Sequence, residues 1–543
     1  MGKQRGSRSA VLSRHWRVAV LMAAGFATVV GGGAGGASAA AGAAAHVASA
    51  AAPRGGNGEE GGPRPDGAQA HKEEGGRGPE GKEHGGREHG GREHGGKEEA
   101  GQEHGGQEEA GKAEAGKEHG GQEQGGKEEA GKEHGGQEYG DKEGARKEAD
   151  GAGHQGWHGE EQEEQGTPVD CDPNQLIDAI EDANEAGGGT LRLAKNCTYT
   201  LTTNDDGNGL PKIFQPITIY GNGSTITRAV DAEDDFRIFY VDNGGDLKLR
   251  DLTISRGKAD EYDPEESNGG AIYVDDAGRL DLECVTLDSN STDDDYDGGA
   301  IYNEGITNIR RSTLSNNSAE DGSAVYNDDG KLTITKSKIT NNIGDQEYGY
   351  GTIDNDGGTT TISKSEISHN TTYNGGGVYN DDGVTDIEDS LLSCNHAYEG
   401  GAVYQDSDSL YLRRSIVEYN TSDNDGGGLY LFADTAIDES VIRDNIATNG
   451  DGGGIWINDD VSIRRTEITH NQATGEGHRG GGVYQDEYTV NLTDTEITKN
   501  TSDEPAGGYH NAGGTVNVYG DVDIVDNDPT NCDGGDTVPF CFG

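Results

Sequence analysis

Aliphatic side chains recur at three positions of a repeat of about 26 residues that runs from residue 272 to residue 527. The repeats align on an asparagine that closes an apolar-x-x-Asn step, and the nine intervals between successive asparagines are 25 to 29 residues long. These asparagines are Asn290, Asn317, Asn342, Asn370, Asn395, Asn420, Asn445, Asn471, Asn500 and Asn527. Three residues before nine of them stand Leu287, Leu314, Ile339, Ile367, Leu392, Val417, Ile442, Ile468 and Ile497. Five residues earlier stand Leu282, Ile309, Ile334, Ile362, Ile387, Leu412, Ile437, Ile463 and Leu492. The third column is Ile272, Ile301, Val325, Ile353, Val378, Val403, Leu429, Ile455 and Val483.

Three short strands per repeat, each with one or two inward apolar side chains, are what a three-sided coil requires. One coil cannot bury these side chains alone, whereas stacked coils form a continuous aliphatic interior. The repeat lacks the leucine spacing of leucine-rich repeats and is too short for a four-stranded propeller blade. We therefore predict an all-β fold, a parallel β-helix, in which each asparagine hydrogen-bonds to its copies in the coils above and below.

Less regular elements precede the aligned coils. Residues 176–186, from Leu176 to Ala186, have the pattern of a short amphipathic helix that would cover the open end of the stack, because an open end is an unpaired strand edge. Strands are expected at Thr190–Leu193, Tyr199–Thr202, Ile217–Tyr220 and Phe239–Val241. These elements place the β-helix domain at residues 168–543.

The first residues have the pattern of an export signal. Five basic residues precede a 13-residue apolar run, Val18 to Val30, which is too short to span a bilayer. Small residues with A-x-A steps follow, so we expect residues 1–39 to be a signal peptide, cleaved after Ala39 or as late as Ala50. The mature protein would then be secreted, with no membrane span.

Residues 40–167 form a low-complexity linker whose central part repeats every five residues, as in Lys82-Glu83-His84-Gly85-Gly86. The repeated part, from Lys82 to about Gly151, contains almost no apolar residue, so it cannot bury enough surface to offset its ordering entropy, and we predict a disordered stalk. Weak metal binding by its histidines is the alternative. These histidines are His84, His89, His94, His104, His119 and His134.

The formal charge of the chain is −57, and loss of the five basic signal residues makes it −62. Such acidity argues against nucleic acid and anionic membrane surfaces as partners.

Six cysteines fit an oxidising compartment. Cys171 and Cys197 lie together at the start of the folded part, and Cys532 and Cys541 lie together at its end, so we predict one disulfide at each end. Cys284 and Cys394 fall four coils apart, roughly 19 Å at the strand spacing. That distance exceeds the Cα separation that a disulfide allows, so we predict two free thiols.

Several segments of the chain resemble secreted bacterial right-handed β-helix repeat proteins of the pectin-lyase-like superfamily. They are residues 178–184, 188–193, 198–201, 217–223 and 249–254. The Gly-Gly-Ala-Ile-Tyr segments at 269–273 and 298–302 are also similar to the repeats of polymorphic outer membrane proteins. The resemblance implies a right-handed coil. It implies no single activity, because the superfamily includes lyases, hydrolases, epimerases and adhesins.

Acidic residues are the first candidates for chemistry. Aspartate pairs recur at one place in the repeat, where turn chemistry explains them without a catalytic role. They are Asp275-Asp276, Asp328-Asp329, Asp381-Asp382 and Asp459-Asp460. Asp293, Asp294, Asp295 and Asp297 break the period and are a candidate calcium site, with a solvated acidic loop as the alternative. Arg256-Gly257-Lys258 resembles the Arg-x-Lys of pectin-hydrolysing relatives but lacks their companion motifs.

Aromatic residues follow the third aliphatic column and, by alternation, should lie outside the tube. They are Tyr273, Tyr302, Tyr326, Tyr379, Tyr404, Tyr430, Trp456 and Tyr484, with Asp354 interrupting the row. Rings at this spacing predict a stiff strip that binds a sugar chain or a protein surface, or a ladder that only stabilises the sheet.

Two functions remain open. The first is a secreted, non-catalytic adhesion protein that presents an extended binding face to a polysaccharide or a cell-surface partner. The second is a polysaccharide lyase or glycoside hydrolase. We expect no cofactor to be required, and calcium is the one candidate.

Overall fold

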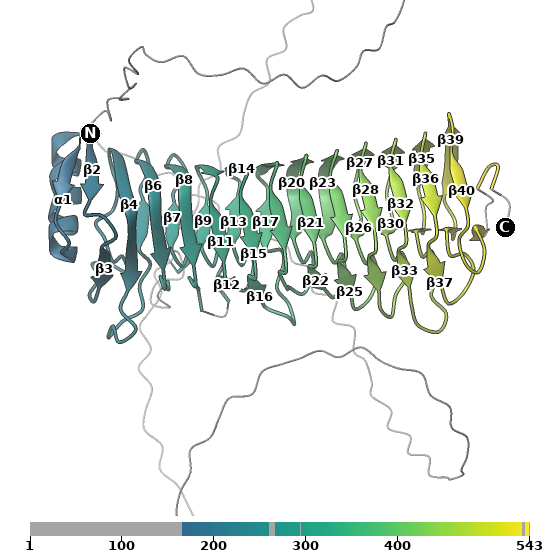
Figure 1. Cartoon of the computed structure of the whole chain (residues 1–543), viewed down its shortest axis with the longest axis horizontal. Coiled ribbons are helices and arrows are strands. Elements are labelled where there is room, and N and C mark those ends of the chain that lie inside the picture. Colours follow the sequence, from purple (N-terminus) through teal and green to yellow (C-terminus); the bar gives the residue numbers. More distant parts are fainter. Residues whose placement is uncertain (1–165, 260–266, 294, 535–537, 542–543) are drawn as a thin grey trace, which may run out of the picture. The chain divides into compact units, whose positions relative to one another are not determined.

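The computed structural model describes residues 166–259, 267–293, 295–534 and 538–541 (Figure 1). The chain divides into two units, Met1–Glu143 and Gly144–Gly543, and only the second contains described residues. The predicted signal peptide and all but the last residues of the predicted linker lie outside them.

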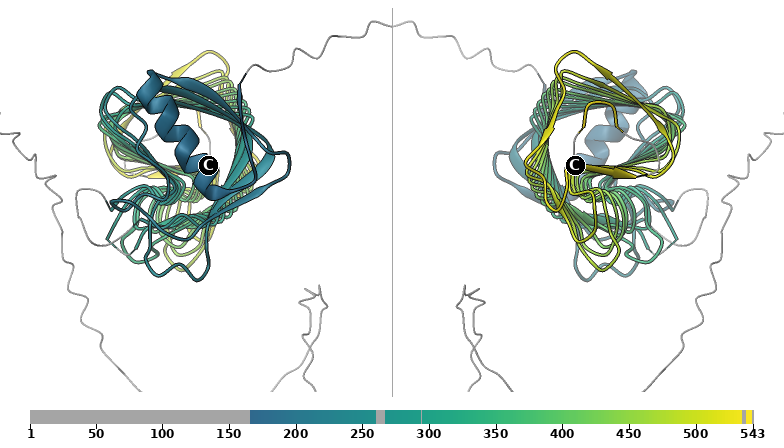
Figure 2. Two further views of the ribbon diagram at one scale, coloured as in Figure 1. Left: turned by 90° about the vertical axis from the view of Figure 1, so that its left-hand side faces the viewer. Right: turned by 90° about the vertical axis from the view of Figure 1, so that its right-hand side faces the viewer.

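The second unit is a parallel β-solenoid whose coils stack side by side along one axis (Figure 1). Each regular coil has three main strands, which form three faces of the tube (Figure 2). The first face contains β5 (Phe239–Val241), β7 (Ile272–Val274), β9 (Ile301–Asn303), β13 (Val325–Asp328), β17 (Ile353–Asp356), the first halves of β20 (Val378–Glu388) and β23 (Val403–Arg413), β26 (Leu429–Leu431), β30 (Ile455–Ile457), β34 (Val483–Gln485), β38 (Tyr509–Asn511) and β41 (Cys532–Gly534).

The second face contains β1 (Thr167–Val169), β2 (Gly189–Leu193), the first halves of β4 (Pro216–Arg228), β6 (Asp246–Ser255) and β8 (Arg279–Asp288), then β10 (Ile306–Arg310), β14 (Lys331–Thr335), β18 (Thr359–Ser363), the second halves of β20 and β23, β27 (Thr435–Asp438), β31 (Val461–Arg464), β35 (Thr489–Thr493) and β39 (Thr515–Tyr519).

The third face contains β3 (Thr198–Leu201), the second halves of β4, β6 and β8, then β11 (Thr313–Ser315), β15 (Lys338–Thr340), β19 (Glu366–Ser368), β21 (Leu391–Ser393), β24 (Ile416–Glu418), β28 (Val441–Arg443), β32 (Glu467–Thr469), β36 (Glu496–Thr498) and β40 (Asp523–Val525). Two-residue strands follow the asparagine turn: β12 (Ser318–Ala319), β16 (Ile343–Gly344), β22 (His396–Ala397), β25 (Thr421–Ser422), β29 (Ile446–Ala447), β33 (Gln472–Ala473) and β37 (Thr501–Ser502).

The predicted vertical rows of aliphatic residues are present. Leu287 pairs with Leu314, and Leu314 pairs with Ile339, in parallel register across β8, β11 and β15. All three side chains are fully buried in one continuous core. Burial of aliphatic surface contributes about 25 cal/mol per Å², so the repeated rows are the main source of stability for the stack.

The asparagines form the predicted ladder at the turn after the third face. In each coil the amide nitrogen donates to the oxygen of the next asparagine, as from Asn370 Nδ2 to Asn395 Oδ1 at 3.0 Å. The backbone N–H of Asn370 donates to the same oxygen at 3.1 Å. The residue before each asparagine has a left-handed backbone, as His369 does with a φ of 59°. This turn interrupts the hydrogen bonds between strands, so the asparagine side chains provide partners for its buried N–H groups.

Two further polar ladders inside the tube escaped the sequence analysis. On the first face, Asn303 Nδ2 donates to Asn327 Oδ1 at 2.6 Å, and the series continues through Asn355 and Asn380. At the corner between the second and third faces, the backbone N–H of Ser312 donates to Ser337 Oγ at 3.2 Å, and later serines repeat this bond. Three lines of side chains along the tube therefore provide hydrogen bonds for its buried polar groups.

One helix, α1 (Pro173–Ala186), lies at the N-terminal end of the coils (Figure 2). It begins three residues before the predicted start, because Asp172 caps it by accepting from the N–H of Asn174 at 2.9 Å and Pro173 suits the first turn. Leu176, Ile180 and Ala183 are buried against the first strands. All four predicted strands in this region are present, as β2, β3, β4 and β5, but β4 continues to Arg228, eight residues beyond the predicted end at Tyr220, because it supplies a strand to both the second and the third face.

The cysteines pair as predicted. Cys171 is bonded to Cys197, with Cα atoms 5.7 Å apart, and Cys532 to Cys541, with Cα atoms 6.2 Å apart. Cys284 and Cys394 are free and exposed.

We expect a thiol-specific reagent to label the native protein at Cys284 and Cys394 only, because both lie at exposed corners, with φ of 56° and 55°. Intact mass should show two adducts before reduction and six after reduction and unfolding. Fewer than two adducts on the native protein would contradict the register of the coils.

Candidate functional site

The eight predicted aromatic residues form a stacked row on the first face, but the row is not an exposed strip. Ring centroids of neighbours lie 4.3 to 6.4 Å apart, as between Tyr430 and Trp456 and between Trp456 and Tyr484. Tyr273, Tyr302, Tyr379, Tyr404, Tyr430 and Trp456 are buried, with relative exposures of 5 to 9%. Only Tyr326 and Tyr484 are half-buried. The row also includes Tyr240 and His510, which the sequence analysis omitted.

Stacking and the glycine corners explain why outward-pointing rings are covered. Each ring lies against the rings of the coils before and after it, so both faces are buried. The turn that precedes the first face passes beside the ring column, and a Cβ on Gly351 (φ of 48°) would lie 2.9 Å from Cβ of Tyr379. The prediction that these rings are exposed is therefore wrong, and the alternative of a stabilising ladder fits the observed burial.

The hydroxyl groups of the rings donate to carboxylates. Tyr302 Oη donates to Asp328 Oδ2 at 2.6 Å, and Tyr326 Oη donates to Asp356 Oδ2 at 2.9 Å. Burial, followed by the charge of Asp328, raises the pKa of Tyr302 far above its ordinary value. Asp328 belongs to one of the aspartate pairs that recur in every few coils. It therefore accepts a hydrogen bond from the stacked tyrosines, which is a structural role and not a catalytic one.

The aromatic row divides into two stacks. One contains Tyr240, Tyr273, Tyr302 and Tyr326, and the other begins with Tyr379. Asp354 occupies the position between Tyr326 and Tyr379, pairing with both in register. The ring of Tyr350, from the preceding turn, packs on Tyr379 at 4.6 Å.

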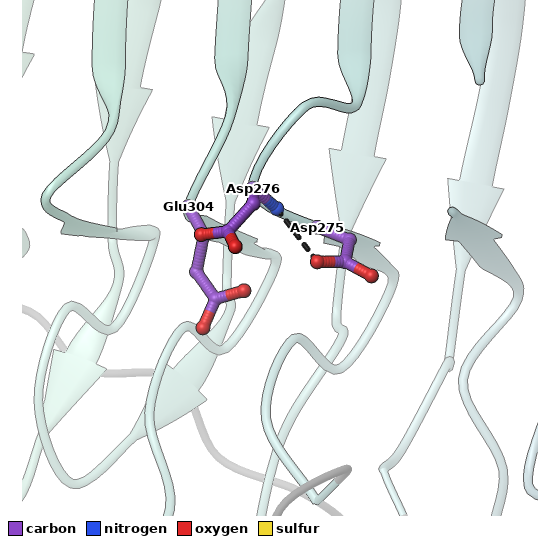
Figure 3. Close-up of side chains that lie close together, drawn as sticks. All are labelled: Asp275, Asp276 and Glu304. Atoms are coloured by element: carbon purple, nitrogen blue, oxygen red, sulfur yellow. Dashed lines mark hydrogen bonds between the residues drawn. The ribbon is translucent and has the colours of Figure 1, made fainter. Parts of the chain in front are cut away.

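Asp275, Asp276 and Glu304 form the one group of three possible metal-ligating side chains found among the described residues (Figure 3). Their carboxylate oxygens lie within 4.8 Å of one another, at the turns after β7 and β9. Burial raises the pKa of Glu304 to about 7, while a hydrogen bond from Tyr273 opposes that rise. Oxygen ligands at this spacing suit a hard cation.

The carboxylates of the predicted calcium loop do not converge on one point in this way. Asp293 is 2.5 Å from Lys258 Nζ, Asp295 is exposed, and Asp294 lies outside the described residues. In the described part of the chain, no group of three ligand atoms within 4.8 Å includes Asp293, Asp295 or Asp297.

Lys258 is not arranged as a catalytic base. Its amine bridges Asp235, at 2.9 Å, and Asp293. Burial favours the neutral amine, but the hydrogen bonds to Asp293 and Asp235 outweigh it and raise the pKa of Lys258. A base needs a lowered pKa, so the Arg-x-Lys motif lacks the chemistry that its resemblance implies.

A basic groove runs along the corner between the second and third faces. It is open, has a volume of about 580 Å³, and crosses five coils. Each coil contributes one corner residue with φ near 50° and one outward residue of the third face, and four of the five also contribute a serine of the buried ladder. The lining residues are Arg311, Ser312, Thr313, Lys336, Ser337, Lys338, Lys364, Ser365, Glu366, Asp389, Ser390, Leu391, Arg414 and Ile416.

Five cations and two carboxylates line this groove, against a chain total of 43 cations and 100 carboxylates. Three of the cations are paired: Lys338 with Glu366 at 2.8 Å, Arg414 with Asp389 at 2.8 Å, and Arg311 with Glu283. Lys336 and Lys364 have no ion pair with any described residue. They occupy equivalent corner positions directly after the paired residues Thr335 and Ser363 of successive coils, so their Cα atoms are about 4.8 Å apart. Sequence analysis missed the groove because the corner residues of successive coils are 25 to 28 residues apart, and only the aligned corner column brings them together.

Comparison with known proteins agrees with this architecture. A family model described as a right handed beta helix region matches residues 323–502. The folded part of the chain is thus a right-handed parallel β-helix. No curated protein sequence matches the chain.

Among solved structures, the A-module of mannuronan C-5 epimerase AlgE6 from Azotobacter vinelandii is 14% identical, with 67% of this chain and 95% of that chain covered and a TM-score of 0.25. PfbA, a surface adhesin of Streptococcus pneumoniae, is 13% identical, with coverage of 65% and 90% and a TM-score of 0.29. The AlgE4 A-module, from the same bacterium as AlgE6, is 13% identical, with coverage of 65% and 94% and a TM-score of 0.28. Likeness at this level bears on neither activity nor ligand. Within the described part of the chain, no helix has the length and apolar character needed to cross a bilayer.

Proposed function

We propose that the protein is a secreted, non-catalytic surface protein of the adhesion type whose β-helix binds an extended anionic polysaccharide along the basic groove. The observation that supports this most directly is that Lys336 and Lys364, on successive coils of an acidic protein, have no ion-pair partner in the described part of the chain. The strand spacing is close to the length of one sugar ring, so a chain with one negative charge per sugar can meet one cation per coil.

The shape of the groove supports binding rather than catalysis. Its serine floor is already used by the ladder, as where Ser337 Oγ accepts the N–H of Ser312, so it offers no activated nucleophile. Its rim contains alkyl stems and charged ends, which suit an extended chain at the surface. The stalk in front of the β-helix would hold the groove away from the surface that bears it.

Binding should depend on the two unpaired lysines. The full-length protein is taken from the culture medium, where its first residue should be Ala40 or Ala51, and titrated with alginate, polygalacturonate and neutral dextran. We expect both anionic chains to bind and dextran not to bind, with affinity falling as salt rises. The double variant Lys336→Glu/Lys364→Glu should bind about tenfold more weakly or worse, equivalent to about 1.4 kcal/mol.

Lys331→Glu is the matched control. Lys331 is exposed at the start of β14, on the second face, has no ion pair with a described residue and does not line the groove. Its variant should bind within about twofold of wild type, because an isolated rim charge away from the ligand contributes little. Equal loss in both variants, or equal binding of dextran, would contradict the proposal.

A polysaccharide lyase or hydrolase is the second candidate, and one observation favours it. The carboxyl of Glu304, with a pKa raised to about 7 by burial, lies beside Asp275 and Asp276. Such a group can exchange protons at neutral pH. Turnover of alginate or polygalacturonate with calcium, followed by ultraviolet absorbance of the unsaturated product and by reducing ends, would establish this function if Glu304→Gln abolished it.

A further inference from the structure

One outward column of the third face is interrupted by aliphatic residues. The column runs in parallel register from Thr253 in β6 to Asp523 in β40. Three successive members, Leu391, Ile416 and Val441, are aliphatic. Every other position of the column holds threonine, lysine, glutamate or aspartate. The interruption is therefore a local departure from a polar surface column.

These three side chains, here called the aliphatic row, point away from the core. Ile416 is 37% exposed, and Leu391 and Val441 are half-buried. The residue after each of them is fully buried, as Val417 is after Ile416, which is the alternation that a strand requires. Packing of the tube therefore does not account for the aliphatic row, which leaves apolar surface in water where the other coils have polar groups.

The aliphatic row continues the line of the basic groove. Leu391 and Ile416 line one end of the groove, and Ile416 and Val441 line a second open hollow of about 330 Å³. Lys336 and Lys364 occupy the corner in the two coils that precede Leu391. A chain bound along the groove thus meets two cations and then three aliphatic side chains, with one coil about every 4.8 Å.

Charges on either side of the aliphatic row are already paired. At the corner, Arg414 binds Asp389 at 2.8 Å. On the other side, Arg443 Nε donates to Glu418 Oε2 at 2.8 Å. This part of the groove therefore offers an apolar surface between neutralised charges, which suits an uncharged apolar substituent rather than a further anionic group.

We propose that the polysaccharide bound by the groove is O-acetylated, and that its acetyl groups contact the aliphatic row while its carboxylates meet Lys336 and Lys364. This inference rests on the proposed function and names the substrate class. The aliphatic row spans about 10 Å over three coils, so it offers one side chain per sugar ring. A protein partner fits less well, because a stable interface buries about 800 Å² on each side, more than three partly buried side chains can supply.

The experiment titrates the full-length protein with chemically O-acetylated alginate and with the same preparation after alkaline removal of the esters. The two ligands then share chain length and carboxylate density and differ only in their acetyl groups. We expect the acetylated chain to bind about tenfold more tightly, equivalent to about 1.4 kcal/mol. Each methyl group buried on binding gains about fourfold in affinity, so contacts with two acetyl groups suffice.

The triple variant Leu391→Thr/Ile416→Thr/Val441→Thr should bind both ligands with equal affinity, and the de-esterified chain as tightly as wild type does. Threonine favours strands and already occupies this column at Thr313, so the coils should fold.

The matched control is Ile306→Thr/Val384→Thr. These two aliphatic residues are 41% and 39% exposed on the second face and do not line the groove. The control variant should keep the tenfold preference for the acetylated chain.

Equal affinity of the wild type for the two ligands would overturn this inference and leave the proposed function standing, whereas failure of both ligands to bind would overturn both. A preference that persists undiminished in the triple variant would also refute the role of the aliphatic row. So would a wild-type dimer that becomes monomeric in the triple variant, because the row would then bind a second copy of the protein.

Discussion

Replacing Asn395 by alanine is expected to lower the free energy of unfolding by about 3–6 kcal/mol, among the largest effects of any single substitution in the chain. Asn395 is 1% exposed and takes part in four side-chain hydrogen bonds. Its Oδ1 accepts from the N–H and Nδ2 of Asn370, at 3.1 and 3.0 Å. Its Nδ2 donates to the carbonyl of Ile367 and to Asn420 Oδ1, both at 3.0 Å.

The cost is large because the partners remain buried without bonds. Alanine leaves the N–H of Asn370 and the carbonyl of Ile367 unsatisfied, and each such group costs about 1–3 kcal/mol. Neighbouring coils share the ladder, so the loss is transmitted to Asn370 and Asn420 rather than confined to one turn.

Thermal and denaturant unfolding, followed by circular dichroism, measure the effect. Asn449→Ala is the control, since Asn449 is exposed and its side chain forms no hydrogen bond with a described residue. The control should change the free energy of unfolding by less than about 0.5 kcal/mol. Equal midpoints for Asn395→Ala and Asn449→Ala would mean that water replaces the ladder without penalty.

The repeat made most of the fold predictable. Leu287, Leu314 and Ile339 could be placed in one row because parallel stacking converts a constant interval in sequence into a neighbour in space. The same logic predicted the asparagine ladder and the free thiols of Cys284 and Cys394.

Sequence patterns were less informative where burial depends on the next coil. Alternation correctly predicts that Tyr302 points away from the core, but exposure also requires an uncovered ring, and stacking at about 5 Å covers it. The polar ladder at Asn303 was missed although alternation from Ile301 points it inward. Its column contains Val274 in the previous coil and Asn327 in the next, so no aliphatic row identifies it.

The basic groove and the gap at Asp354 were beyond sequence reasoning for a different reason. Asp354 was noticed only as an interruption of the aromatic row. That it is buried with an unsatisfied oxygen follows from the packing of Tyr326 and of the turn at Asp321, which no repeat position specifies.

Chelated protein is expected to melt about 4 °C higher at pH 5.5 than at pH 8, corresponding to about 3 kcal/mol. Burial raises the pKa of Glu304 to about 7, the pKa of Asp381 to about 7, and the pKa of Asp425 to about 6. All three are half-buried, so after solvent screening each contributes on the order of 1 kcal/mol.

The sign follows from proton uptake. Between the unfolded pKa values near 4 and the raised folded values, the folded protein binds more protons than the unfolded chain. The stabilisation that these three carboxyl groups contribute is therefore fully present below about pH 4 and is lost as pH rises toward 7. Groups with lowered pKa act in the opposite direction: hydrogen bonds from Asn316 and Ser315 outweigh the effect of burial on Asp288, and this contribution disappears only as pH falls through its lowered pKa. Stability should therefore be greatest on the acid side of neutrality.

A melting series from pH 4 to pH 8 in chelator measures this dependence, and Asp425→Asn should flatten the slope by about one third because it removes one of three comparable contributions. A midpoint that falls steadily from pH 8 to pH 5.5 in chelator would show that ionised, not protonated, carboxyls hold the first face together.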